Sequence, residues 1–197
     1  MNYISFEKVF KPFGIVSVSQ VRATKLVFDK NNFGRWEKQG LLMKLRNGYY
    51  AFADIAGKEG FAHYVASKIY KPSYISLHTA LAFHGIIPET INEITSVSSL
   101  KTSTFKNSLG TFSYKKIKPR LMFGYDAVEK NGFTFFISSP EKAVLDLLYL
   151  EPSYNFKKEL RNSRLDWKKL TAFAKKFEKK VILEKIDMLK KIFLEDI

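Results

Sequence analysis

The clearest periodic stretch of the chain is NNFGRWEK, where apolar and polar positions follow a helical period. Phe33 and Trp36 are three residues apart and share one face, whereas Asn31, Arg35 and Lys38 share the opposite face. The pattern predicts a helix that packs its aromatic side inward. Its polar side is then free to meet solvent or a partner.

A tight hairpin is predicted directly after this helix. Gly40 fits a left-handed C-terminal cap because it has no Cβ. The strand-like segments Leu41–Arg46 and Tyr49–Ala53 flank Asn47-Gly48, the dipeptide that a two-residue type I′ turn prefers. The polar side chains expected on or near the hairpin tip are Lys44, Arg46 and Asn47.

Two further helices are predicted nearer the start of the chain. Ser5–Phe10 is short and partly apolar, and a proline and a glycine follow it. Ser17 and Gln20 have the spacing of a capping box, so a second helix should begin at Ser17 or Ser19 and run to about Lys25.

The resulting order of helix, helix, turn, helix and hairpin is that of a winged helix-turn-helix, and we expect it to form a DNA-binding domain over residues 1–56. A module of the same shape that makes only protein contacts is the alternative. The candidate DNA-contacting residues are Gln20, Arg22, Asn31, Arg35, Lys38, Lys44, Arg46 and Asn47.

Residues 55–60 contain two glycines between patterned segments and form the candidate linker, which places a second domain at 57–197. Helices are predicted at Phe61–Tyr70 and from Ser76 or Leu77 to His84. Segments rich in β-branched and aromatic residues then predict four strands, at Ile94–Val97, Thr111–Ile117, Gly124–Glu129 and Phe133–Ile137.

A buried helix should follow the strands. Ser139 can serve as N-cap with Pro140 at the first helical position, and the segment that follows to Leu150 is apolar nearly all round. Two basic amphipathic helices are predicted at Leu165–Phe177 and Val181–Leu194. The predicted class is α+β, with a winged helix-turn-helix followed by a larger α+β domain that has a mainly antiparallel sheet and C-terminal helices.

Charge and composition limit the classes of molecule that this protein is expected to bind. The chain has 33 lysines and arginines against 19 acidic residues, a formal charge of +14, which favours a polyanion and nucleic acid ahead of membrane. The absence of cysteine excludes disulfides, thiolate nucleophiles and cysteine metal sites and fits a reducing cytosol. No apolar run approaches the roughly 20 residues of a membrane span, so we expect a soluble, cytoplasmic protein without a membrane partner.

Enzyme chemistry finds little support in the sequence. His63, His78 and His84 form no metal-binding pattern, and phosphate-binding loops, serine nucleophile elbows and paired aspartates for two metals are absent. Glu141 and Asp146 are five residues apart and thus about 140° apart around a helix, so we expect first-turn and surface roles for them. We expect no catalytic activity, no metal and no cofactor.

Three segments in order carry a resemblance: LLMKLRNGYYAFA, KPSYISLHTALAFHGIIPE and FFISSPEKAVLDLLYL. Their order and separations resemble the AbiEi-type antitoxin family of type IV toxin–antitoxin (abortive infection) systems of bacterial phage defence. The resemblance implies an N-terminal winged helix that binds operator DNA and represses its own operon. It also implies a C-terminal domain that counteracts a co-expressed nucleotidyltransferase toxin, with or without direct contact.

The lysines of the C-terminal helices have three competing interpretations: a solvated helix face, a second nucleic-acid surface, or a patch facing an acidic toxin or its RNA substrate. The candidates are Lys175, Lys176, Lys179 and Lys180. Our hypothesis is an autorepressing, DNA-binding antitoxin whose partners are double-stranded operator DNA and a nucleotidyltransferase toxin. The alternatives are a stand-alone winged-helix regulator and a protein-interaction scaffold that does not bind DNA.

Overall fold

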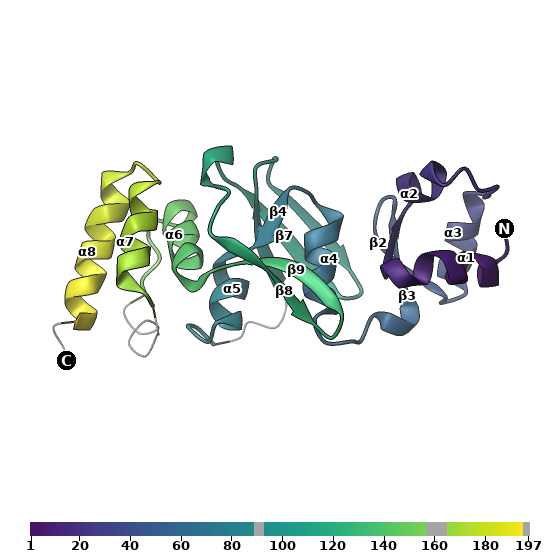
Figure 1. The fold of residues 1–197 in the computed structure, drawn as a ribbon, viewed down its shortest axis with the longest axis horizontal. Coiled ribbons are helices and arrows are strands. Elements are labelled where there is room, and N and C mark those ends of the chain that lie inside the picture. Colours follow the sequence, from purple (N-terminus) through teal and green to yellow (C-terminus); the bar gives the residue numbers. More distant parts are fainter. Residues whose placement is uncertain (89–92, 157–164, 195–197) are drawn as a thin grey trace.

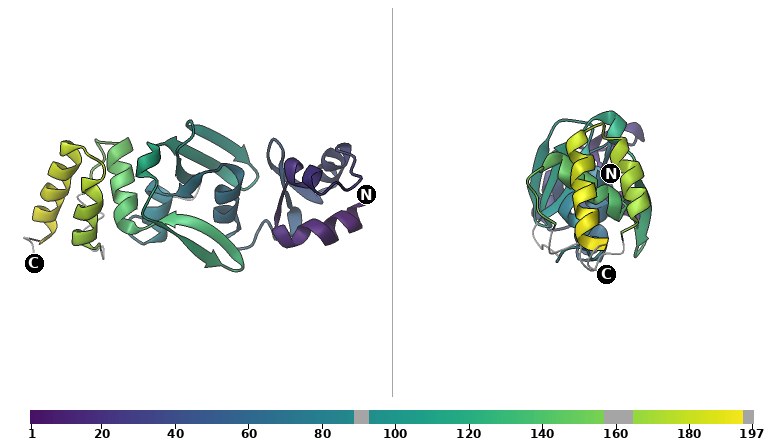
Figure 2. Two further views of the ribbon diagram at one scale, coloured as in Figure 1. Left: turned by 45° about the horizontal axis from the view of Figure 1, so that its top comes forward. Right: turned by 90° about the vertical axis from the view of Figure 1, so that its left-hand side faces the viewer.

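The computed structural model describes residues 1–88, 93–156 and 165–194. The chain is a mixed α+β protein in which two units follow one another along a long axis, with the N-terminal residues and the last helix at opposite tips (Figure 1). Seen down this axis, the C-terminal helices lie in front of the other elements (Figure 2). No helix in the described ranges is both long and apolar enough to cross a bilayer.

The N-terminal unit contains three helices and a small sheet. Helices α1 (Tyr3–Phe10), α2 (Val18–Ala23) and α3 (Asn31–Lys38) are followed by a hairpin of strands β2 (Leu42–Arg46) and β3 (Tyr49–Phe52). Strand β1 (Ile15–Ser17) pairs with β3 and gives the sheet order β1-β3-β2. The helices and hairpin match the predicted order, whereas β1 was not predicted because a three-residue strand shows no usable alternation.

An aromatic cluster holds this unit together. Phe6 of α1 is fully buried, and its ring lies 5.8 Å from Phe33 and 4.8 Å from Trp36, the two inward residues of α3. Phe28 and Phe52 also contact Phe6, at centroid distances of 5.5 and 5.9 Å. Burial of these rings fixes which face of α3 points outward, as the spacing predicted.

Local capping signals were predicted correctly. The Ser17 hydroxyl accepts a hydrogen bond from the Gln20 backbone N–H at 3.0 Å and starts α2, and Gly40 has φ +71° after α3. Helix α1 begins two residues before the predicted start, because the Asn2 side chain caps it by accepting from Ser5 N–H at 2.9 Å.

The turn predicted at Asn47-Gly48 is wrong in type. A type I′ turn needs positive φ at both residues, but only Gly48 has it, at +78°, and the strand register shifts between Lys44 and Arg46. The Asn-Gly signal at 131–132 does give positive φ at both residues, +52° and +80°. In the first hairpin, the strand before the turn carries the register shift and contacts the second unit, and the Asn-Gly dipeptide alone encodes neither feature.

The second unit is built on a six-stranded sheet with the order β6-β7-β5-β4-β9-β8. The strands are β4 (Ser73–Ile75), β5 (Glu93–Ser98), β6 (Ser103–Asn107), β7 (Gly110–Lys116), β8 (Tyr125–Lys130) and β9 (Phe133–Ser138). Neighbouring strands β5 with β7 and β4 with β9 are parallel, whereas the other three pairs are antiparallel. The sheet is therefore mixed, and β4 and β6 were missed because they lack a run of β-branched residues.

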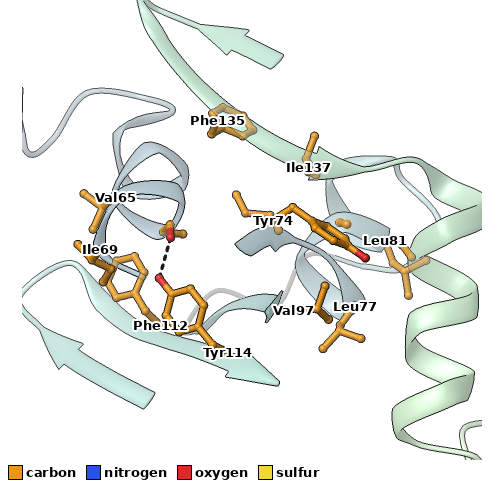
Figure 3. Close-up of a cluster of buried hydrophobic side chains, with 14 of the residues drawn as sticks. Val65, Ile69, Tyr74, Leu77, Leu81, Val97, Phe112, Tyr114, Phe135 and Ile137 are labelled. Carbon is orange, nitrogen blue, oxygen red and sulfur yellow. Dashed lines mark hydrogen bonds between the residues drawn. The ribbon is translucent and has the colours of Figure 1, made fainter. Parts of the chain in front are cut away.

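Helices cover this sheet and extend the unit toward the C-terminus. Helix α4 (Phe61–Ile69) packs against β4, β5 and β9, and α5 (Leu77–Phe83) packs between β5 and α6 (Pro140–Leu150). Helices α7 (Trp167–Lys175) and α8 (Lys180–Leu194) then pack against each other and against α6. Figure 3 shows the core between α4, α5 and the sheet, where the Tyr114 hydroxyl donates to the Ala66 carbonyl at 2.8 Å.

The two units contact each other along the hairpin. Strand β2 lies beside β6, and the Asn107 side-chain amide donates to the Leu45 carbonyl at 3.0 Å. The Tyr64 hydroxyl of α4 donates to the Phe13 carbonyl at 2.8 Å. Within the predicted linker, Gly60 has φ +85° and a Cβ there would lie 2.9 Å from the Lys130 carbonyl. The predicted linker is thus held closely against the second unit.

Glu141 joins α6 to α7. Its Oε1 accepts from Asp166 N–H at 3.3 Å, and Lys169 Nζ lies 2.9 Å from its Oε2. Burial raises the pKa of Glu141, but the nearby Lys169 ammonium and then the hydrogen bonds to the carboxylate lower it by more, so the net pKa lies below its usual range. This carboxylate therefore stabilises the folded state when it is ionised.

We predict that Glu141→Gln lowers the free energy of unfolding at pH 7 by about 1 kcal/mol, after allowing for solvent screening at Lys169. Because the folded-state pKa is depressed, this stability is present above the unfolded pKa of about 4.3 and is lost as pH falls through the folded value. Urea unfolding at pH 7 and pH 3 should show the difference between wild type and variant shrinking in acid. An equal difference at both pH values would contradict the role of the charge.

Candidate nucleic-acid interface

The predicted polar face of α3 is exposed. Asn31, Arg35 and Lys38 all lie at the surface, opposite the buried Phe33 and Trp36. Three side chains that can donate hydrogen bonds therefore project from one side of one helix, which is the arrangement used for reading base edges in a major groove.

Arg35 is held in place by a residue that the sequence reading did not select. Its guanidinium donates to the Asn32 Oδ1 at 2.7 Å, and the buried Asn32 donates from Nδ2 to the Met1 carbonyl at 3.2 Å. Asn32 is thus a positioning residue. The spacing of three residues on a helix was the available signal, because side chains at i and i+3 are neighbours.

Gly34 lies on the same exposed face. A Cβ placed on it would have no atom within 4 Å, and its φ is not positive, so neither packing nor backbone conformation requires glycine here. A glycine in a helix interior costs about 1 kcal/mol relative to alanine. Its presence leaves a bare stretch of backbone at one edge of the polar face, next to Asn31 and Lys38.

Helix α2 places the other two helical candidates differently. Arg22 is exposed, whereas Gln20 is half-buried and lines a cleft between the two units together with Ser17 and Tyr49. The Gly48 carbonyl at the hairpin tip accepts a hydrogen bond from the Val18 N–H at 2.9 Å, so this tip is tied to the start of α2. The α2 N-terminus and the hairpin tip therefore form one continuous surface.

The three candidate residues of the hairpin differ in their exposure to solvent. Lys44 and Asn47 are exposed, but Arg46 is half-buried at the contact with the second unit. The Arg46 guanidinium lies 4.6 Å from the ring centroid of Tyr49 and 5.0 Å from that of Phe105. This position favours a structural role for Arg46, as a cation–π contact between the units.

The four C-terminal candidates gather at the turn between α7 and α8, and all four are exposed: Lys175, Lys176, Lys179 and Lys180. Lys176 Nζ lies 4.6 Å above the Phe123 ring, and Lys179 Nζ lies 4.2 Å above the Tyr149 ring. Lys180 Nζ lies 3.4 Å from Glu184. Aromatic contacts thus fix two of these cations on the surface.

A buried ionic cluster is the main polar feature that the sequence reading missed. Lys142 and Asp146 of α6 have no exposed surface and form an ion pair, and Asp146 Oδ2 also accepts from the hydroxyls of Tyr74 (2.9 Å) and Ser76 (2.8 Å). The expected surface role of Asp146 is therefore wrong. Lys142 also donates to the Tyr74 oxygen at 2.7 Å and lies over the Phe123 ring.

Desolvation dominates the ionisation of this cluster. Burial lowers the pKa of Lys142 and raises that of Asp146, and burial next to Asp146 raises the pKa of Tyr74. Tyr74, Ser76, Lys142 and Asp146 are all fully buried. The spacing of four residues between Lys142 and Asp146 indicates a possible ion pair on one helix face. It was not recognised because the rest of the helix is apolar.

The three histidines contact aromatic rings, and His63 and His84 both lie against the ring of Phe83. His84 Nε2 lies 2.8 Å from the Ser138 carbonyl, His63 stacks on Phe135, and the His78 ring meets Tyr154. In the described ranges no group of three or more histidine and acidic side chains is arranged to hold a metal ion. Comparison with models of protein families and with curated proteins found no match to this chain.

Proposed function

We propose that this protein is a sequence-specific DNA-binding regulator whose N-terminal unit is a winged helix-turn-helix, with α3 as the recognition helix. The observation that carries the proposal is the exposed face of α3, where Asn31, Arg35 and Lys38 project beside the bare backbone of Gly34. Arginine and asparagine are the side chains that read guanine and adenine by paired hydrogen bonds. The net charge of +14 adds attraction to the phosphate backbone.

We further propose that the regulator is the AbiEi-like antitoxin of a type IV toxin–antitoxin pair and represses its own operon. Its support is the resemblance of three segments, two of which meet in the fold. Tyr74 and Ser76 come from the second segment and bind Asp146 of the third, so these two resembling segments form one packed unit. Because one buried ionic cluster takes residues from both segments, the two segments have a physical reason to occur together.

Two cellular assays separate the proposals. A reporter driven by the DNA upstream of the protein's own reading frame should be repressed by the full-length chain. Co-expression should restore growth to cells that produce a nucleotidyltransferase toxin from the neighbouring frame. Repression without rescue would leave a stand-alone regulator, and loss of both would leave a protein-interaction scaffold.

Gly34 provides a prediction in which stability and binding move in opposite directions. Gly34→Ala should raise the free energy of unfolding by about 0.4–1 kcal/mol, since alanine is the better helix former and meets no atom. The added methyl should hold α3 away from the groove and weaken promoter binding about tenfold. Urea unfolding and fluorescence anisotropy measure the two effects.

Gly57→Ala is the matched control, because Gly57 also has open space and no positive φ but lies outside α3. It should leave DNA affinity unchanged. If Gly34→Ala binds DNA as the wild type does, α3 does not enter the groove closely.

A further inference from the structure

The cleft between the two units has a volume of about 280 Å³. Phe13, Ser17 and Gln20 line it on the side of the N-terminal unit. On the side of the second unit it is lined by Lys68 of α4 and by Lys71, which follows this helix. Small-molecule sites in proteins have volumes of about 300–1,000 Å³, so this cleft suits a ligand at the small end of that range.

The two lysines of the cleft have no acidic partner among the described residues. No carboxylate in that part of the chain lies within ion-pair distance of Lys68 or Lys71. Lys68 Nζ instead lies 4.8 Å from the ring centroid of Tyr64, which also lines the cleft. Burial, and then the neighbouring Lys71, lower the pKa of Lys68, because desolvation and a like charge both disfavour its ammonium form. An anion held between the two lysines would relieve this repulsion.

The N-terminal side of the cleft contributes an aromatic ring and neutral polar groups. Phe13 is 52% exposed although its side chain is large and apolar. Its backbone is fixed, because the Phe13 carbonyl accepts from the Tyr64 hydroxyl at 2.8 Å. A planar ring of a ligand can stack on such an exposed aromatic side chain. Ser17 and the half-buried Gln20 add a hydroxyl and an amide, which can both donate and accept hydrogen bonds.

We propose that the cleft between the units binds a nucleoside monophosphate, with the phosphate at Lys68 and Lys71 and the base stacked on Phe13. A phosphate monoester carries close to two negative charges at pH 7, which matches two lysines without acidic partners. The base supplies the planar ring, and its polar edge can form hydrogen bonds with Ser17 and Gln20. A ligand in this cleft contacts both units, but its binding requires no DNA and is therefore independent of the proposed DNA-binding function.

Isothermal titration calorimetry of the full-length chain with the 5′-monophosphates of adenosine, guanosine, cytidine and uridine tests the site without DNA. At least one of them should bind with a dissociation constant of about 0.1 mM or lower. The variant Lys68→Gln with Lys71→Gln should weaken this binding at least about tenfold, because it removes the charge-assisted hydrogen bonds to the phosphate. The matched control, Lys190→Gln with Lys191→Gln, removes two exposed charges at the end of α8 and should bind as the wild type does.

Phe13→Ala separates the contribution of the base from that of the phosphate. It should weaken nucleotide binding about tenfold through loss of stacking and leave the affinity for inorganic phosphate unchanged. Circular dichroism should show the wild-type fold in every variant. Absence of binding by all four monophosphates at millimolar concentration would overturn the proposal. Equal losses in the cleft variant and the Lys190 and Lys191 control would also overturn it, as would nucleotide affinity that Phe13→Ala leaves unchanged.

Discussion

Asp146→Asn should lower the free energy of unfolding by about 3–5 kcal/mol, the largest loss that we expect from a single substitution in this protein. The amide is nearly the same size, so the loss comes from charge. Lys142 would stay fully buried with no anion beside it, and Tyr74 and Ser76 would face a weaker acceptor. Urea unfolding at pH 7, followed by circular dichroism, measures the change, and an unaltered slope with denaturant would show that the folded state kept its compactness.

A double-mutant cycle isolates the ion pair. Lys142→Met alone should also destabilise the fold, because it leaves Asp146 buried and unpaired. The double variant Lys142→Met with Asp146→Asn should be less destabilised than the sum of the two by about 1–3 kcal/mol. Lys168→Met, at an exposed position of α7, serves as the control and should change stability by no more than about 0.5 kcal/mol. A loss below about 1 kcal/mol for Asp146→Asn would contradict a charged pair in the core.

Arg35→Ala should weaken binding to the promoter duplex by about 1–3 kcal/mol and relax the preference at one base position. The expected cause is loss of the paired hydrogen bonds from a guanidinium that Asn32 orients. Arg35→Lys keeps the charge but cannot make both bonds, so it should lose the base preference while keeping the salt dependence. Binding to duplexes that differ at single base pairs gives the measurement.

Asn32→Ala tests the same contact from its other partner. It removes the 2.7 Å bond that holds Arg35 without touching DNA itself, so it should reduce base preference more than non-specific affinity. A uniform loss on every duplex after Arg35→Ala would instead assign this side chain to the phosphate backbone. Unchanged affinity would place it outside the interface.

Local signals in the sequence predicted the helical elements well. Ser17 and Ser139 each cap a helix by accepting a hydrogen bond from the backbone N–H three residues later. Phe33 and Trp36 define the buried face of α3. These features depend on residues within one or two turns, so a single sequence contains them. The exposed candidates on α3 follow from the same periodicity, because burial of one face determines the other.

Features that depend on partners distant in sequence could not be read in this way. From the sequence, Arg46 is predicted to lie at an exposed hairpin tip. In the structure its guanidinium lies over the ring of Phe105, which belongs to the second unit. The parallel pairing of β4 with β9 joins residues 75 and 137, and neither segment specifies the other's direction. The lysine-containing segments SKIYKPS, SSLKTST and YKKIKPR likewise meet only through strand pairing, and none of them alone indicates that it lies beside the other two.

Competition between a promoter duplex and a scrambled duplex of equal length tests the central claim most directly. With a labelled promoter duplex at fixed salt, the wild-type chain should require about a thousandfold more scrambled than promoter competitor for displacement, as for a sequence-specific regulator. Arg35→Ala should narrow that ratio. Equal displacement by the two duplexes, with the same salt dependence, would contradict sequence-specific DNA binding by this protein.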